Sequence, residues 1–147
     1  MSVLLVSMPE QSVADTDPAY QQFIGDWELV SYVVFPENGA ERDMNYVGYL
    51  SYDEQGNMAG LGMPKDLPER SADSSERVTG GFAYWGGVSV DVDGGRVIHH
   101  VEGSPMAPRW VGGDNVRYYE FVDDLLKLSL RNEAGRVTAT LTWRKLG

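Results

Sequence analysis

The chain has 147 residues, which suits one domain whose core is large enough to need neither disulfides nor metal for stability. It contains no cysteine, and this excludes disulfide scaffolds, thiol nucleophiles, iron–sulfur clusters and cysteine-ligated zinc. The 12 basic residues against 22 acidic ones give a net charge of −10, and such an acidic body repels the phosphates of nucleic acids. We therefore expect a folded domain that does not bind nucleic acid.

The first residues, MSVLLVSMPEQS, form a short apolar run without the basic residues that begin a signal peptide. No stretch is long and apolar enough to predict a transmembrane helix. These two features lead us to expect a cytoplasmic protein that does not associate with membranes. Residues 1–22 are polar and contain Pro9 and Pro18, so we expect a loose N-terminal arm before a domain spanning 23–147.

After residue 22, short segments rich in β-branched and aromatic residues alternate with Gly, Asn, Asp and Pro. Most of the intervening segments are as short as hairpin loops, which is typical of an antiparallel meander. The longer stretch at 64–80 contains two prolines and a cluster of Ser, Asp and Glu, so we expect a loop there. The pattern predicts eight strands, at 27–35, 46–52, 57–63, 82–92, 96–104, 115–121, 125–131 and 136–144.

The last strands show the alternation expected when one face of a sheet is buried. Leu126, Leu128 and Leu130 are separated by Lys127 and Ser129. Eight sequential strands of this kind avoid exposed edges by closing into an up-and-down barrel. The sequence therefore predicts an all-β, eight-stranded antiparallel barrel, a size that holds either packed side chains or one small ligand.

Several segments of this chain resemble the small bacterial and fungal lipocalin-like domain family, over about residues 23–145. The resemblance implies a barrel with an internal cavity and no particular reaction. It also implies that Trp27 closes one end of the barrel and that Arg144 covers Trp27 by stacking. Gly80 and Gly81 stand where relatives often have a helix, which implies a more open mouth. The segments are GDWELVSY (25–32), GYLSYDEQGNM (48–58), AYWGGVSVD (83–91), VIHHVEGSPMAPRWVG (97–112), VRYYE (116–120) and LTWR (141–144).

His99 and His100 are the only histidines, and neighbours in a strand point to opposite faces. This argues against a shared metal site, and we expect neither a metal nor a cofactor. His99 shares its face with Val97 and Val101, so patterning favours His99 as the residue inside the barrel. The opposite register would place His100 and Glu102 in the cavity as a proton-transfer pair. A core histidine that is hydrogen-bonded for structural reasons alone also accounts for this pattern.

Arg117 alternates with apolar and aromatic residues so that it points inward, where an unpaired guanidinium is costly. Three partners would satisfy it: an inward Glu102, backbone carbonyls with tyrosine hydroxyls, or an anionic or oxygen-rich ligand. The alternative is a buried polar contact that only sets the register of the barrel.

We expect four aromatic residues, Tyr52, Tyr84, Trp110 and Tyr119, at or near the cavity, with Trp110 on a proline-rich loop that covers its mouth. Tyrosine and tryptophan offer apolar contact with a few hydrogen-bonding groups, which suits a flat or cyclic ligand. For any single one of them core packing is the better explanation, and we assign Trp27 and Trp143 to the core.

These residues allow two main functions. One is a cofactor-free isomerase, cyclase or dehydratase of natural-product metabolism, acting on a cyclic, aromatic or polyketide-like compound. In that enzyme His99 would move the proton, and Arg117 with a tyrosine hydroxyl would stabilise an enolate-like oxyanion. The alternative is a non-catalytic carrier of a small apolar ligand, with Arg117 anchoring its polar end. A homodimeric structural module is a third interpretation. No GxSxG or P-loop motif supports a hydrolase or a nucleotide-binding protein.

Overall fold

A computed structural model describes residues 17–68 and 80–147. Within these ranges there is no α-helix, and no helix is long and apolar enough to cross a membrane. The elements are η1 (Pro18–Gln22), β1 (Gly25–Val34), β2 (Arg42–Asp43), β3 (Tyr46–Tyr52), β4 (Asn57–Pro64), β5 (Phe82–Asp91), β6 (Arg96–Gly103), η2 (Pro108–Trp110), β7 (Asp114–Val122), β8 (Leu125–Arg131) and β9 (Val137–Leu146), where η marks a 3-10 helix.

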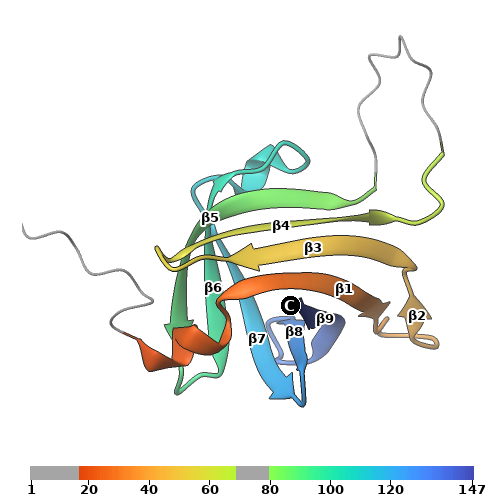
Figure 1. The fold of residues 1–147 in the computed structure, drawn as a ribbon. Helices are drawn as coiled ribbons and strands as arrows, with labels where there is room; N and C mark the ends of the chain where they lie inside the picture. The colour runs from red at the N-terminus through yellow and green to blue at the C-terminus, as the bar shows by residue number, and fades with distance from the viewer. Residues whose placement is uncertain (1–16, 69–79) are drawn as a thin grey trace, which may run out of the picture.

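The strands form one antiparallel sheet that closes on itself. Each long strand pairs with the next along the chain, and β9 returns to pair with β1. Figure 1 shows β1, β3, β4 and β5 lying side by side, with β9 meeting β1 where the sheet closes. The two-residue β2 only extends the far end of β1. The predicted eight-stranded closed barrel is therefore confirmed, because closure pairs both edges that an open meander would expose.

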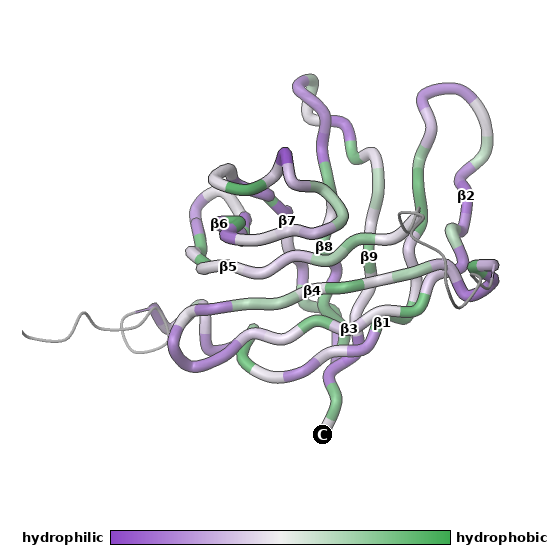
Figure 2. Tube along the Cα trace, turned by 90° about the horizontal axis from the view of Figure 1, so that it is seen from above, coloured by the Kyte–Doolittle hydropathy of each residue, from purple (hydrophilic) through white to green (hydrophobic). Residues whose placement is uncertain are grey.

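The alternating apolar residues face the interior, as patterning requires. Leu126 and Leu128 of β8 are buried and face Leu141 and Trp143 of β9 across the ladder. The hydrophilic residues gather on the connections, most clearly around β2 (Figure 2). The expected loop at 64–80 begins after β4, and its residues 69–79 lie outside the described part of the chain.

The N-terminal side of the domain differs from the loose arm expected over residues 1–22. Pro18–Gln22 is a 3-10 helix, capped by the Asp17 carboxylate, which accepts a hydrogen bond from the Ala19 amide at 3.0 Å. Tyr20 is completely buried, and its hydroxyl donates to the Asp53 carbonyl at 2.7 Å. Burial of this ring orders the segment, so the expectation is wrong for residues 18–22; residues 1–16 lie outside the described structure.

Trp27 lies buried next to η1, where its Nε1 donates to the Phe23 carbonyl at 2.9 Å. The cation over its ring is Lys145, with Nζ 5.5 Å from the ring centroid. Arg144 instead lies beside Glu28 on the outer face, 3.5 Å from its carboxylate. The expected stacking of Arg144 on Trp27 is therefore wrong, because the β1–β9 register pairs Trp27 with Lys145 and Glu28 with Arg144.

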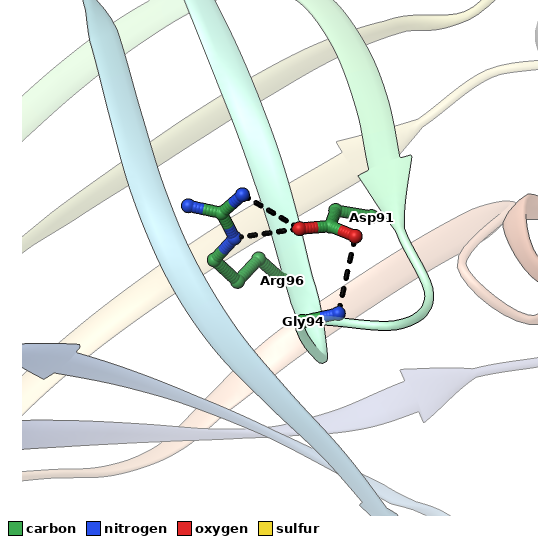
Figure 3. Close-up of polar contacts among 3 residues, drawn as sticks. All are labelled: Asp91, Gly94 and Arg96. Atoms are coloured by element: carbon green, nitrogen blue, oxygen red, sulfur yellow. Dashed lines mark hydrogen bonds and ion pairs between the residues drawn. The ribbon is translucent and has the colours of Figure 1, made fainter.

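The β5–β6 hairpin is held by a polar contact between its two strand ends (Figure 3). The Asp91 carboxylate accepts from Arg96 Nε at 2.9 Å and from an Arg96 terminal nitrogen at 2.6 Å, and it accepts from the Gly94 amide at 3.1 Å. These hydrogen bonds, those of Arg96 first, hold the pKa of Asp91 below its ordinary value. The contact fixes the start of β6, the strand that carries His99.

Candidate functional site

A cavity of about 280 Å³ lies inside the barrel, between its buried aromatic residues and η2. Leucines from β3, β8 and β9 supply aliphatic contact, and the polar members of the lining include His99 and Arg117. Tyr32 and Tyr46 meet edge to face at 5.0 Å between ring centroids, and Tyr84 meets Trp110 in the same way at 5.5 Å. The aromatic lining comprises Tyr32, Tyr46, Phe82, Tyr84, Trp110 and Trp143.

His99 is the innermost polar residue of the cavity, with 1% of its surface exposed. Its Nε2 lies 2.7 Å from the Tyr52 hydroxyl, and its Nδ1 lies 2.7 Å from the Tyr84 hydroxyl. Burial lowers the pKa of His99 to about 3, and the nearby charge of Arg117 acts in the same direction. His99 is therefore neutral near pH 7, and both of its ring nitrogens are already hydrogen-bonded.

Arg117 lines the cavity from β7, as the alternation predicted. Its terminal nitrogen donates to the Val116 carbonyl at 3.0 Å, and no carboxylate pairs with it among residues 17–68 and 80–147. Burial raises the pKa values of Tyr32 and Tyr84, and the positive charge of Arg117 opposes this increase at both residues. Of the three expected partners, an inward Glu102 is ruled out, because Glu102 is exposed on the outer face.

The Tyr84 hydroxyl lies where three polar side chains converge. His99 is hydrogen-bonded to it, and both Arg117 and Asn115 lower its pKa against the larger effect of burial. Asn115 Nδ2 is buried, yet it makes no hydrogen bond of good geometry within the described residues, and Trp143 Nε1 shares this condition. Two buried N–H groups, those of Asn115 and Trp143, are therefore left without an acceptor in the described part of the chain.

The predicted aromatic residues occupy different layers of the barrel. Tyr84 and Trp110 line the cavity, whereas Tyr52 is buried one layer deeper and contacts His99. Tyr119 does not line the cavity. Its ring packs edge to face on Phe23, with the two ring centroids 5.1 Å apart, near the end of the barrel that η1 covers. Trp143, which we assigned to the core, is buried but also lines the cavity.

Asn115, Tyr32 and Tyr46 contribute to the site and were missed by sequence reasoning. Asn115 was detectable, because it lies two residues before Arg117 on the same face of β7. Tyr32 and Tyr46 gave no comparable signal, since patterning distinguishes inner from outer faces but does not show how far along the barrel the cavity extends.

His100 and Glu102 lie on the outer face, so the register that would place them inside is wrong. His100 Nδ1 lies 2.7 Å from the Asp114 carboxylate, and His100 Nε2 lies 2.7 Å from Ser89 Oγ. This is the connectivity of a Ser–His–Asp triad, but Ser89 lies within the β5–β6 ladder, where strand pairing uses the backbone amides. An oxyanion hole needs free backbone amides directed at one point. Because the amides near Ser89 are used in strand pairing, we assign no catalytic role to Ser89, His100 and Asp114.

Within the described residues, no group of three or more His, Asp or Glu side chains is placed to hold a metal ion. What the interior offers is a small aromatic cavity with one cation and several hydrogen-bond donors. Such a cavity has the size and lining of a site for a small organic molecule.

Comparison with solved structures finds the same fold elsewhere. A lipocalin-like protein from Bacteroides uniformis ATCC 8492 is 15% identical, with 85% of this chain and 99% of that chain covered at a TM-score of 0.51. An uncharacterized protein from Bacteroides eggerthii DSM 20697 is 14% identical, with 84% and 99% covered at a TM-score of 0.47. Among curated proteins, none matches this chain. The model of the lipocalin-like domain family matches residues 24–146, and the chain therefore belongs to that family.

Proposed function

We propose that this barrel binds a small cyclic or aromatic molecule in the cavity between His99 and Trp110. The observation that carries this proposal is the aromatic lining around Arg117, the one cation that lines the cavity among the described residues. The volume of about 280 Å³ lies just below the usual range of ligand pockets, roughly 300–1,000 Å³, so the ligand must be small. A ligand of one to three fused rings suits this space better than a long fatty acyl chain.

The polar contacts favour binding and carriage over acid–base catalysis by His99. Both ring nitrogens of His99 are hydrogen-bonded to tyrosines, and its low pKa keeps it neutral. No carboxylate lines the cavity within the described residues, so no second group there is placed to remove a proton. In this function Arg117 anchors the polar end of the ligand, while the aromatic side chains hold its rings.

The second candidate is catalysis of isomerisation, cyclisation or dehydration, and the Tyr84 hydroxyl beside Arg117 favours it. Hydrogen-bond donors at a carbonyl oxygen stabilise the charge that develops during enolisation, while solvent water takes up the proton that leaves the neighbouring carbon. If this candidate is correct, the protein accelerates deuterium exchange next to the carbonyl of bound 2-tetralone in D2O, as followed by NMR. Tyr84→Phe should then slow the exchange by roughly 10²–10⁴-fold. If deuterium exchange proceeds at the rate seen without the protein, the catalytic function is excluded and only the carrier function remains.

The proposed binding is tested by filling the cavity. Leu130 lines it from β8, whereas Lys127 of the same strand lies outside the cavity and serves as the matched position. Leu130→Trp should abolish calorimetric binding of 2-naphthoate, because the larger side chain occupies the space of the rings. Lys127→Trp should leave the dissociation constant unchanged. Equal binding by both variants would place the ligand elsewhere, and weaker binding of naphthoate than of dodecanoate by the unmodified protein would contradict the preference for rings.

A further inference from the structure

Resting on that proposed function, we infer that the ligand enters with a carbonyl or carboxylate oxygen foremost, and that Tyr84 and Arg117 donate hydrogen bonds to this oxygen. The inference follows from the hydrogen-bond chain Tyr52–His99–Tyr84 at the floor of the cavity. This chain determines which hydroxyl hydrogen remains free.

Neutral His99 has one nitrogen that donates and one that accepts. Its two partners are tyrosine hydroxyls at 2.7 Å, so one tyrosine donates to the ring and the other accepts from it. Tyr52 is almost fully buried, and His99 is its one hydrogen-bond partner among the described residues. If Tyr52 accepted from His99, its own hydroxyl hydrogen would be buried without an acceptor, which is unfavourable. Tyr52 therefore donates to Nε2.

With Nε2 accepting, the proton of His99 is on Nδ1, and Nδ1 donates to the Tyr84 oxygen. The hydroxyl hydrogen of Tyr84 is then free. Arg117, whose charge acts on Tyr84, has only N–H donors and so offers no acceptor for this hydrogen. Tyr84 and Arg117 line the cavity together, and both have hydrogens to offer a ligand.

The floor of the cavity therefore selects by hydrogen-bond polarity. A carboxylate or ketone oxygen accepts from Tyr84 and Arg117 at once, and a carboxylate also neutralises the charge of Arg117. A hydrocarbon leaves these donors unpaired. An ammonium group binds worst, because it can accept no hydrogen bond from Tyr84 or Arg117 and is repelled by the positive charge of Arg117. Tyr52 and His99 are positioning residues, because they act on the ligand through Tyr84.

Four naphthalenes that share one ring system test the selection: 2-naphthoate, 2-acetylnaphthalene, 2-ethylnaphthalene and 2-naphthylmethylammonium. Titration calorimetry should give affinities that fall in this order. Tyr84→Phe should weaken binding of the ketone about tenfold, the worth of one hydrogen bond, and should leave the hydrocarbon unchanged. Arg117→Met should remove most of the advantage of the carboxylate over the ketone.

A second experiment tests the direction of the hydrogen bonds in the Tyr52–His99–Tyr84 chain. Nitrogen-15 NMR of the protein should show His99 as the Nδ1–H tautomer. Tyr52→Phe should convert part of it to the other tautomer and weaken ketone binding, whereas Tyr119→Phe, at a tyrosine outside the cavity, should change neither. An Nε2–H tautomer in the unmodified protein, or equal affinity for all four compounds, overturns the inference while the binding function stands. Failure of all four to bind overturns both.

Discussion

Arg117 places a positive charge inside the barrel, and the described residues offer it a backbone carbonyl but no carboxylate. An inward charge with no counter-ion opposes folding, because its desolvation is not compensated. Arg117→Met keeps most of the volume and removes the charge. We expect the free energy of unfolding of the ligand-free protein to rise by about 1–2 kcal/mol, while the affinity for 2-naphthoate falls.

Urea denaturation together with calorimetry measures both effects. The matched control is Arg131→Met, since Arg131 lies on the outer face with its guanidinium 3.9 Å from the Tyr118 ring centroid. That variant should lose about 0.5–1 kcal/mol of stability and keep its affinity. A loss of stability in Arg117→Met with unchanged affinity would mean that Arg117 serves only to set the register of the barrel.

At the level of single residues, the sequence predicted which side chains face the interior of the barrel but not which residues they contact. Alternation placed His99 and Arg117 inside, because the period of a strand is two. The partners of His99 are side chains from β3 and from the neighbouring β5, and the pattern of one strand does not show which side chains of other strands meet it. For the same reason Lys145, and not Arg144, proved to be the cation over Trp27.

Among the strands, the pairing of β5 with β6 is irregular: Trp85 pairs with Gly103 and Gly86 with Val101, so β6 carries one extra residue there. A Cβ at Gly86 would overlap the His100 carbonyl group, whereas a Cβ at Gly87 would have its nearest neighbour, the Gly56 carbonyl oxygen, 3.9 Å away. Gly86→Ala should therefore cost about 1–3 kcal/mol of stability, and Gly87→Ala should stay within about 0.5 kcal/mol.

Urea denaturation of the two variants checks this pair. Because the shift in register lies beside β6, Gly86→Ala should also displace His99 and weaken binding of 2-acetylnaphthalene. Equal stabilities for the two alanine variants would show that the strands separate there at little cost.

The eight long strands were predictable because each ends in turn residues and most show alternation. The 3-10 helix η1 was not, since its five residues carry little intrinsic preference and are ordered by the burial of Tyr20 in the barrel. Local pattern gives the strands, whereas the segments that fold onto them depend on tertiary contacts.

For the whole molecule, the outer surface of the closed barrel also carries apolar side chains. Val47, Leu61, Met63 and Trp85 are exposed on the outer face of β3–β5, where Trp85 keeps 51% of its surface accessible. Apolar side chains gathered in this way are a common feature of interaction surfaces. The homodimer, which the sequence allowed as a third interpretation, stays untested, and the cytoplasmic location stays a prediction.

The stability of the whole barrel should depend on pH through His99. Its pKa is about 3 in the folded chain against an ordinary value of 6.5, so the unfolded chain takes up the proton first as the pH falls. The contribution of neutral His99 is thus complete above pH 6.5 and is lost progressively between pH 6.5 and 3. One proton of this kind adds a slope of about 1.4 kcal/mol per pH unit to the free energy of unfolding.

Chemical denaturation between pH 3 and 6.5 measures this slope in the unmodified protein, His99→Gln and His100→Gln. The carboxylates titrate in all three proteins, so a difference between their profiles comes from the histidines. The unmodified protein should lose stability more steeply than His99→Gln as the pH falls. His100→Gln is the matched control for the substitution itself, because His100 is exposed beside Asp114 and Ser89 and lies outside the cavity. Parallel profiles for the unmodified protein and His99→Gln would show that His99 takes up its proton as readily in the folded barrel as in the unfolded chain. That result would also remove the neutral histidine on which the donor arrangement of Tyr84 depends.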